Sequence, residues 1–242
     1  MQIISIATQK GGTGKTTTAS ALAYASADDG KRCLAIDLDP QADLTYMLGA
    51  DAGKLDAYDF LNGTEGRYVI QTVRPFLDVI PASKNLSAIV SARGSARRLA
   101  DALEPVKDSY DIIIIDTPPT AGELQYNALM ASTGVIIPLE AEASNLRGLV
   151  QILDTVHQIQ KVNKKLKVKG YLITRYDGRS TLARQMREAV ENTSQQSKIP
   201  FLGVIRAGIS AREASALQKS IFEYAPKSKP ALDYMALYQS IK

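Results

Sequence analysis

Seven short, mostly aliphatic runs alternate with longer stretches of helical periodicity along this chain of 242 residues. The runs are Ile3–Ala7, Cys33–Ile36, Leu77–Ile80, Ile112–Ile115, Val135–Leu139, Val168–Ile173 and Phe201–Ile205. The helical patterns between them include Thr16–Ala27, Ala96–Leu103, Leu146–Lys161 and Thr181–Thr193. Strands that are apolar along their whole length are buried on both faces, as in a parallel sheet that helices cover on both sides. The pattern predicts an α/β fold with a mostly parallel, twisted sheet of about seven to eight strands.

Length and composition indicate one domain over residues 1–242, because no Gly/Ser/Pro-rich linker divides the chain. The longest aliphatic run, Ile112–Ile115, is far shorter than the roughly 20 apolar residues of a membrane helix. We expect no signal peptide, since the N-terminus has neither a basic segment nor a cleavage site. The single cysteine, Cys33, excludes a disulfide framework or a four-cysteine metal site within one chain. We therefore expect a cytoplasmic protein.

A glycine-rich segment separates the first predicted strand from the first predicted helix. Its residues are Lys10, Gly11, Gly12, Thr13, Gly14, Lys15, Thr16 and Thr17. Glycines allow successive backbone N–H groups to point at phosphate oxygens, and the N-terminus of the following helix adds partial positive charge. The spacing predicts that Lys15 reaches the β- and γ-phosphates and that the Thr16 hydroxyl is a ligand of Mg²⁺. We therefore expect a P-loop NTPase that binds ATP and Mg²⁺.

Carboxylates follow two of the predicted strands. In a parallel α/β sheet, ligands bind at the carboxyl ends of the strands. Asp37 and Asp39 are two residues apart on an extended segment, so their side chains are expected to point the same way. Asp39 is expected to position the attacking water or to hold the water shell of the metal. Capping of a helix is the alternative role for Asp39. Asp116 ends the Ile112–Ile115 run and is expected to hold Mg²⁺ through its water shell.

The phosphate loop departs from the standard pattern, since position 9 is Gln9 and a second lysine, Lys10, precedes the glycines. Lys-Gly-Gly-x-Gly-Lys-Thr-Thr resembles the deviant Walker A motif of the ParA/MinD ATPase superfamily. That resemblance implies that Lys10 crosses a dimer interface to the nucleotide of the opposite subunit. There Lys10 would stabilise the developing phosphate charge, as an arginine finger does. Lys10, Lys15 and Asp39 are thus the expected catalytic residues.

Further segments resemble ParA/Soj-type partition ATPases. They are Asp39-Pro40-Gln41, Asp116 to Ala128 with its Pro118-Pro119, Ile137 to Glu142 followed by Leu146-Arg147-Gly148-Leu149, Leu172 to Asp177, and Glu223 to Ala231. The resemblance thus covers nearly the whole chain. It implies that Asp39 orients the hydrolytic water and that the segments near Thr174 and Arg206 border the adenine. The family more often continues Gly-Asn after the Asp-Pro-Gln motif, where this chain has Ala42-Asp43.

The charge of the chain is unevenly distributed. Residues 1–145 carry 12 Lys/Arg and 18 Asp/Glu, a net charge of −6, whereas residues 146–242 carry 17 and 7, a net charge of +10. A basic region of this kind indicates a polyanionic partner. The candidate DNA contacts are Arg175, Arg179, Arg184, Arg187, Arg206, Arg212, Lys219, Lys227 and Lys229. The lysine-rich segment Lys161–Lys169 is interpreted instead as an exposed turn that enters a strand.

The resemblance implies a DNA-partition ATPase located on the nucleoid. ATP would join two subunits into a dimer that binds DNA non-specifically, and a ParB-like adaptor or centromere-binding protein would stimulate a weak basal hydrolysis. Two alternatives from the same superfamily stay open, a MinD-like membrane switch and an ATPase that positions a protein cargo. A membrane anchor is poorly supported, because the final segment Tyr234–Lys242 has a single lysine.

Overall fold

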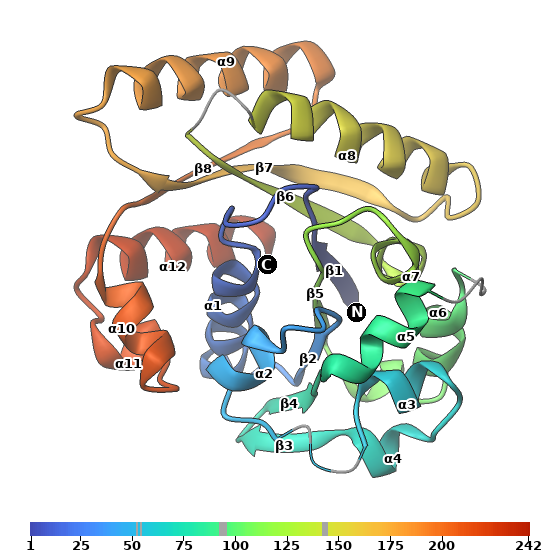
Figure 1. The fold of residues 1–242 in the computed structure, drawn as a ribbon. Coiled ribbons are helices and arrows are strands. Elements are labelled where there is room, and N and C mark those ends of the chain that lie inside the picture. The colour runs from blue at the N-terminus through green and yellow to red at the C-terminus, as the bar shows by residue number, and fades with distance from the viewer. Residues whose placement is uncertain (52, 54, 92–95, 142–144) are drawn as a thin grey trace.

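The strands form one eight-stranded sheet in the order β3-β4-β2-β5-β1-β6-β7-β8 (Figure 1). The computed structural model describes residues 1–242 except 52, 54, 92–95 and 142–144. The strands are β1 (Gln2–Ile6), β2 (Cys33–Asp37), β3 (Gln71–Arg74), β4 (Leu77–Ile80), β5 (Ile112–Asp116), β6 (Gly134–Glu140), β7 (Lys167–Tyr176) and β8 (Phe201–Arg206). All pairings are parallel except that of β3 with β4. The predicted fold class is thus confirmed.

Helices cover both faces of the sheet. They are α1 (Lys15–Asp28), α2 (Asp43–Met47), α3 (Ala57–Leu61), α4 (Gly66–Val69), α5 (Ser87–Ser91), α6 (Arg98–Leu103), α7 (Glu123–Ala131), α8 (Asn145–Gln160), α9 (Thr181–Ser197), α10 (Ser210–Ala216), α11 (Ile221–Tyr224) and α12 (Lys229–Ile241). Short 3₁₀ turns span Lys84–Leu86 and Lys107–Ser109. Within the described ranges, no helix combines the length and apolar composition that a membrane span requires.

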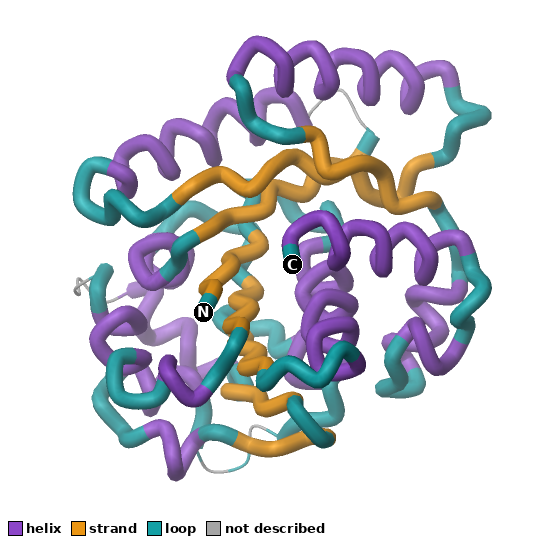
Figure 2. Tube along the Cα trace, turned by 180° about the vertical axis from the view of Figure 1, so that it is seen from behind, coloured by secondary structure: helices purple, strands orange, loops and turns teal. Residues whose placement is uncertain are grey.

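Alternate residues of the central strands supply the two halves of the core. On β5, Ile114 packs in the cluster that contains α1 and α12, whereas Ile113 and Ile115 pack in the cluster under α3 and α5–α7. Figures 1 and 2 show these two groups of helices on opposite sides of the sheet. A third cluster buries one side of α8 and α9 against β6 and β7. The aliphatic runs are therefore apolar on both faces because both faces are covered.

Strand β3 was not among the predicted strands. Its sequence, Gln71-Thr72-Val73-Arg74, contains a single aliphatic residue, Val73. It pairs antiparallel with β4 at the edge of the sheet, and none of its residues is fully buried. An edge strand of this kind needs no apolar run, so hydrophobic patterning cannot detect it.

The parallel register brings the ends of the central strands together. Ile6, the last residue of β1, lies opposite Asp116, and Asp37 lies opposite Asp116 on the other side. On the neighbouring pair, Glu140 lies opposite Thr174. The loop that follows β1 is therefore flanked by the carboxyl ends of β5 and β6, and all of these polar groups share one edge of the sheet.

Candidate functional site

The loop between β1 and α1 takes its shape from glycines with positive φ. Gly12 has a φ of +79° and Gly14 a φ of +76°, and Gly14 is the N-cap of α1. A Cβ atom added to Gly14 would also lie 3.3 Å from the Thr174 side chain. Backbone conformation and close approach both favour glycine there. The loop therefore presents backbone N–H groups and the N-terminus of a 14-residue helix, which is an arrangement suited to phosphate.

Lys15 is the buried cation of this loop. Its side chain is 6% exposed, and its Nζ donates to the Lys10 carbonyl at 3.2 Å. Burial lowers the pKa of Lys15, and the carboxylates of Asp116 and Asp39 oppose that shift. The ammonium is thus held between the loop and two acidic side chains, as expected for a lysine that contacts the phosphates of a nucleotide. Lys10 itself is half-buried at the rim of the loop.

Asp116 has a carboxyl oxygen suited to a hydrated metal ion. Its Oδ1 accepts from the Thr117 N–H at 3.1 Å, while its Oδ2 is buried and has no hydrogen-bond partner among the described residues. Burial, and then the carboxyl of Asp37, raise the pKa of Asp116 well above its usual value, whereas the Thr16 hydroxyl and Lys15 lower it. A divalent cation supplies the positive charge and water ligands that this oxygen needs. The predicted pair of Thr16 and Asp116 therefore fits Mg²⁺.

Asp37 shapes the segment that carries Asp39. Its Oδ1 accepts from the Asp39 N–H at 3.0 Å, and its Oδ2 accepts from the N–H of Thr45 at 2.9 Å and from its hydroxyl at 2.8 Å. The Thr45 hydroxyl in turn accepts from the Ala82 N–H at 2.8 Å. Burial raises the pKa of Asp37 to about 6, although these hydrogen bonds act in the opposite direction. Sequence reasoning noted Asp37 without assigning it this anchoring role.

Asp39 lies half-buried between this anchor and the phosphate loop. Its Oδ1 accepts from the Gln41 N–H at 3.0 Å, which closes a tight turn. The following helix α2 begins at Asp43 with Ala42 as its N-cap, so Asp39 does not cap that helix. Ala42 has a φ of +59°, a conformation that glycine adopts more readily. The replacement of the family's usual glycine by Ala42 thus falls on a position where glycine would fit better.

A cleft of about 600 Å³ opens beside the phosphate loop. Its walls come from the loop itself, from the ends of β7 and β8, and from α10 and α12. The lining includes Gly14, Thr17, Met47, Thr174, Arg175, Arg206, Ile209, Arg212, Pro230 and Tyr234. Thr174 donates from its Oγ1 to the Thr13 carbonyl at 2.8 Å. The predicted pair of Thr174 and Arg206 therefore lines one cleft next to the phosphate loop, and this cleft has room for a nucleoside.

Arg206 is held in place by Asp233, a residue of α12 that sequence reasoning missed. The Nη2 of Arg206 donates to Asp233 Oδ1 at 2.7 Å and its Nε donates to Oδ2 at 2.9 Å. The backbone N–H of Arg206 also donates to Oδ2, at 2.8 Å. A two-point pair of this kind fixes the plane of the guanidinium. No local motif marks Asp233, because it lies 27 residues from its partner.

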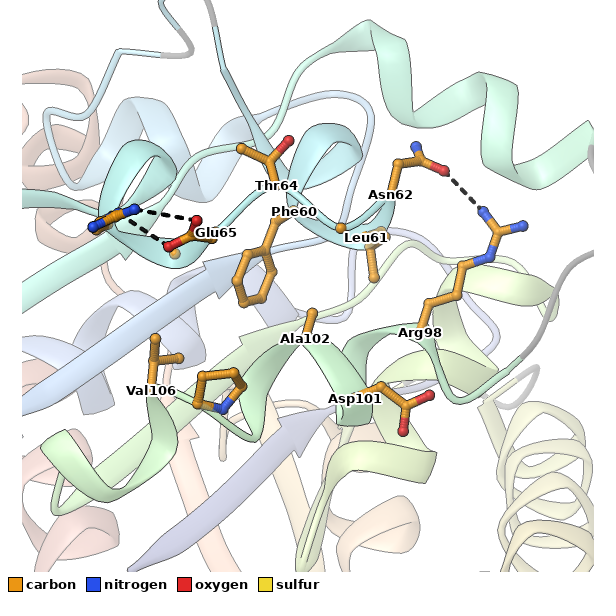
Figure 3. A pocket seen from close by; sticks show the side chains of 13 residues that line it. Phe60, Leu61, Asn62, Thr64, Glu65, Arg98, Asp101, Ala102 and Val106 are labelled. Carbon is orange, nitrogen blue, oxygen red and sulfur yellow. Dashed lines mark hydrogen bonds and ion pairs between the residues drawn. The ribbon is translucent and has the colours of Figure 1, made fainter.

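A second, larger cavity of about 760 Å³ lies between the α3–α4 segment and α6 (Figure 3). Its apolar lining includes Phe60, Ala102 and Val106. The charged Arg67 at its edge pairs with Glu65 at 3.0 Å. The cavity shares none of its lining residues with the phosphate loop. It therefore takes no part in the nucleotide site.

The candidate DNA contacts fall into two groups. Four of them form ion pairs, which are Arg175 with Glu140 at 3.4 Å, Arg179 with Asp177 at 3.1 Å, Arg187 with Glu191 at 2.8 Å, and Arg206 with Asp233 at 2.7 Å. The others are exposed and form no ion pair with a described residue, namely Arg184, Arg212, Lys219, Lys227 and Lys229. Glu142, named in the sequence resemblance, lies outside the described residues.

Comparisons with known proteins identify relatives of this chain that are ATPases, in agreement with a nucleotide site at the phosphate loop. Residues 1–168 match the family model described as an AAA domain. The sporulation initiation inhibitor protein Soj of Bacillus subtilis is 38% identical over 251 residues, which cover 99% of this chain and 98% of that protein. The chain belongs to the ParA/MinD family of ATPases. The chromosome-partitioning ATPase Soj of Thermus thermophilus is 37% identical over an alignment that covers 98% of this chain and 94% of that protein.

Solved structures share the fold of this ParA/MinD ATPase over its whole length. Cobyrinic acid a,c-diamide synthase from Mycobacterium smegmatis, with bound ADP and magnesium, has a TM-score of 0.82 and 30% identity over 99% of this chain and 93% of its own. MinD from Pyrococcus horikoshii, complexed with Mg-ADP, has a TM-score of 0.83 and 25% sequence identity. The match covers 100% of this chain and 96% of that chain. The chain is thus an ATPase whose cofactors are ATP and Mg²⁺. When bound, Mg²⁺ would neutralise phosphate charge between Thr16 and Asp116.

Proposed function

We propose that this ATPase is a DNA-partition switch in which ATP joins two subunits face to face. The observation that carries the proposal is the open carboxyl edge of the sheet. There the phosphate loop carries Lys10 and Lys15, Asp39 lies near Lys15, and Gly11 and Gly12 are exposed. A second subunit placed on this edge would cover both glycines and bring its own Lys10 to the nucleotide. Hydrolysis would then remove the charge that holds the two subunits together.

DNA is the proposed partner of the ATP-bound dimer. The exposed cations on α10 and in the segments that join α10, α11 and α12, among them Arg212, Lys219 and Lys227, are available to phosphates because no ion pair with a described residue occupies them. Lysine and arginine contacts to the backbone bind DNA without reading its sequence. The name of the Thermus relative, a chromosome-partitioning ATPase, supports the same assignment. A ParB-like adaptor would then stimulate hydrolysis and release the DNA, and the protein would be located on the nucleoid.

A MinD-like membrane switch is less well supported. Such a switch needs an amphipathic helix with an apolar face available to lipid. The apolar side of α12 is already buried, through Tyr234, Leu237, Tyr238 and Ile241, in the cluster that contains α1. Leu232 is the one large apolar residue of α12 that is exposed. The remaining alternative is an ATPase that positions a protein cargo instead of a plasmid or chromosome. Its nucleotide site would be the same, and only its partner would differ.

Binding to random-sequence duplex DNA tests the proposal. Gel shifts at a fixed, stated salt concentration would compare ATP, ADP and no nucleotide, for the wild type and for Lys15→Ala. We expect binding with ATP only, abolished by Lys15→Ala and weakened steeply by salt. Anionic vesicles serve as the competing surface. ATP-dependent binding to vesicles without binding to DNA would contradict the proposal, and binding to neither would favour a protein cargo.

A further inference from the structure

The turn between α8 and β7 carries a set of lysines that the nucleotide site does not use. We call residues 161–167 the α8–β7 turn. Its cationic residues Lys161, Lys164, Lys165 and Lys167 are all exposed. No ion pair to a described residue involves any of these four ammonium groups, and the sequence contains no Asp or Glu from position 155 to position 176. The positive charge of the turn is therefore not neutralised locally.

The backbone of this turn is fixed by hydrogen bonds from Asn163. Its Nδ2 donates to three carbonyls at the end of α7, those of Leu129 at 3.0 Å, Met130 at 3.1 Å and Ser132 at 2.8 Å. The side chain of Gln160 donates to the Leu166 carbonyl at 3.0 Å. Leu166 is itself buried in the core under α8. The lysines thus project from an ordered support, which lowers the entropy cost of binding compared with a flexible charged loop.

The charged groups of the neighbouring helix α6 and the turn after it are paired with one another, so they leave little free negative charge beside the lysines. Lys164 and Lys165 line a hollow of about 400 Å³ together with Arg97 and Lys107. Lys107 pairs with Glu104 at 2.6 Å and Arg97 pairs with Asp101 at 3.9 Å, so the cations of this hollow without an ion pair to a described residue are Lys164 and Lys165. Lys198, just before β8, is also exposed. The amino ends of β7 and β8 therefore present one cationic surface.

This surface lies far from both the phosphate loop and the C-terminal helices. The turn ends at the first residue of β7, whereas the nucleotide cleft lies at the other end of the same ten-residue strand, about 30 Å away. Figures 1 and 2 place the turn on one flank of the molecule and α10–α12 on the opposite flank. A single straight duplex lying along the C-terminal helices of one subunit would therefore not reach it.

We propose that the α8–β7 turn binds the phosphate backbone of a second DNA duplex, so that one dimer bridges two duplexes. The proposal rests on the face-to-face dimer described above, in which the carboxyl edges meet and the amino edges point outward at the two ends. Duplex phosphate is the favoured occupant because the surface offers closely spaced, unpaired ammonium groups on a fixed backbone. The exposed apolar side chain of the turn is a single one, Val162, which is less than a lipid-inserting surface needs.

A bridging assay tests this inference. One duplex is immobilised on beads, and capture of a second, labelled duplex is measured with ATP, alongside direct binding to a single duplex. The turn variant is Lys164→Gln/Lys165→Gln. The matched control is Arg67→Gln/Lys84→Gln, which removes two exposed cations elsewhere. A third variant, Arg212→Gln/Lys219→Gln, alters the C-terminal surface.

We expect the turn variant to lose bridging at least tenfold while its single-duplex affinity stays within about threefold of the wild type. The control should bridge normally, and the C-terminal variant should lose single-duplex binding. Bridging by the turn variant at the wild-type level, or a wild type that binds DNA without bridging, would overturn this inference alone. A wild type without ATP-dependent DNA binding would overturn the proposed function as well. Capture of anionic vesicles that depends on Lys164 and Lys165, without bridging of DNA, would overturn the inference and indicate that the partner of the turn is a membrane surface.

Discussion

Asp37 and Asp116 lie opposite each other on neighbouring strands, and both carboxyl groups are fully buried. Their surroundings give them different tasks. The carboxyl oxygens of Asp37 accept hydrogen bonds from Asp39 and Thr45, and these bonds fix the segment before α2. The Oδ2 of Asp116, in contrast, has no hydrogen-bond partner among the described residues. Burial raises the pKa of both carboxyl groups, and repulsion from Asp37 raises the pKa of Asp116 further. A cation beside Asp116 would relieve that repulsion.

The first prediction concerns the metal site. Asp116→Asn should weaken the activation of ATP hydrolysis by Mg²⁺ on the order of 10- to 100-fold, as found for residues that hold a metal through its water shell. A Mg²⁺ titration of hydrolysis at saturating ATP measures the effect. Asp111→Asn is the control, because Asp111 precedes β5 at the opposite end and pairs with Arg32 near the surface. An unchanged Mg²⁺ dependence in Asp116→Asn would contradict the assignment.

The second prediction concerns stability against pH. The pKa of Asp37 is raised from 3.8 to about 6, so the folded state binds more protons than the unfolded state between these values. The free energy of unfolding should therefore fall as the pH rises from about 4 to about 6, by at most about 3 kcal/mol from this group. Urea unfolding across this pH range measures the slope. Asp37→Asn should flatten it, and an equal slope in the variant would show that other groups dominate.

The third prediction concerns Ala42, which has a φ of +59°. Ala42→Gly should raise the free energy of unfolding by about 0.5–1 kcal/mol, because glycine adopts this conformation without the clash that a Cβ causes. Ala189→Gly, within helix α9, should instead lower it by about 1 kcal/mol. Urea denaturation compares the two variants. Destabilisation by both substitutions would contradict the account of Ala42.

The fourth prediction concerns the two-point pair of Arg206 with Asp233. Asp233→Asn should free the guanidinium and weaken ATP binding by about tenfold, equivalent to about 1.4 kcal/mol. Fluorescent-nucleotide titration measures the affinity. Asp177→Asn breaks the exposed pair with Arg179 and should leave the affinity unchanged. If Asp233→Asn bound ATP as tightly as Asp177→Asn and the wild type, the pair with Asp233 would not contribute to ATP binding.

The sequence predicted those parts of the candidate site that are contiguous in the chain. Lys15 and Thr16 follow the glycines directly, and Asp116 ends an aliphatic run, so local patterns suffice to place them. The roles of Asp37 and Asp233 could not be predicted in the same way. Each depends on hydrogen bonds between segments whose relative position is set by tertiary packing.

The same limit applies to the basic residues and to the fold. Charge counting gave equal weight to Arg179 and Lys219, yet Arg179 forms an ion pair with Asp177 while Lys219 forms none with a described residue. Likewise, the buried strands were predicted from their aliphatic runs, whereas the half-exposed edge strand β3 was missed. Hydrophobic patterning reports burial and is therefore least informative at the surface.

The central claim is that each ATP site is completed by Lys10 of the opposite subunit. Mixing Lys10→Ala subunits with Asp39→Ala subunits tests it most directly, because each variant alone lacks one residue at both sites. A mixed dimer would contain one complete site, with Asp39 from one subunit and Lys10 from the other. We predict that the equimolar mixture regains about a quarter of the wild-type hydrolysis rate, as expected for a charge supplied in trans. A rate no higher than the mean of the two variants, with dimers still forming, would contradict the account.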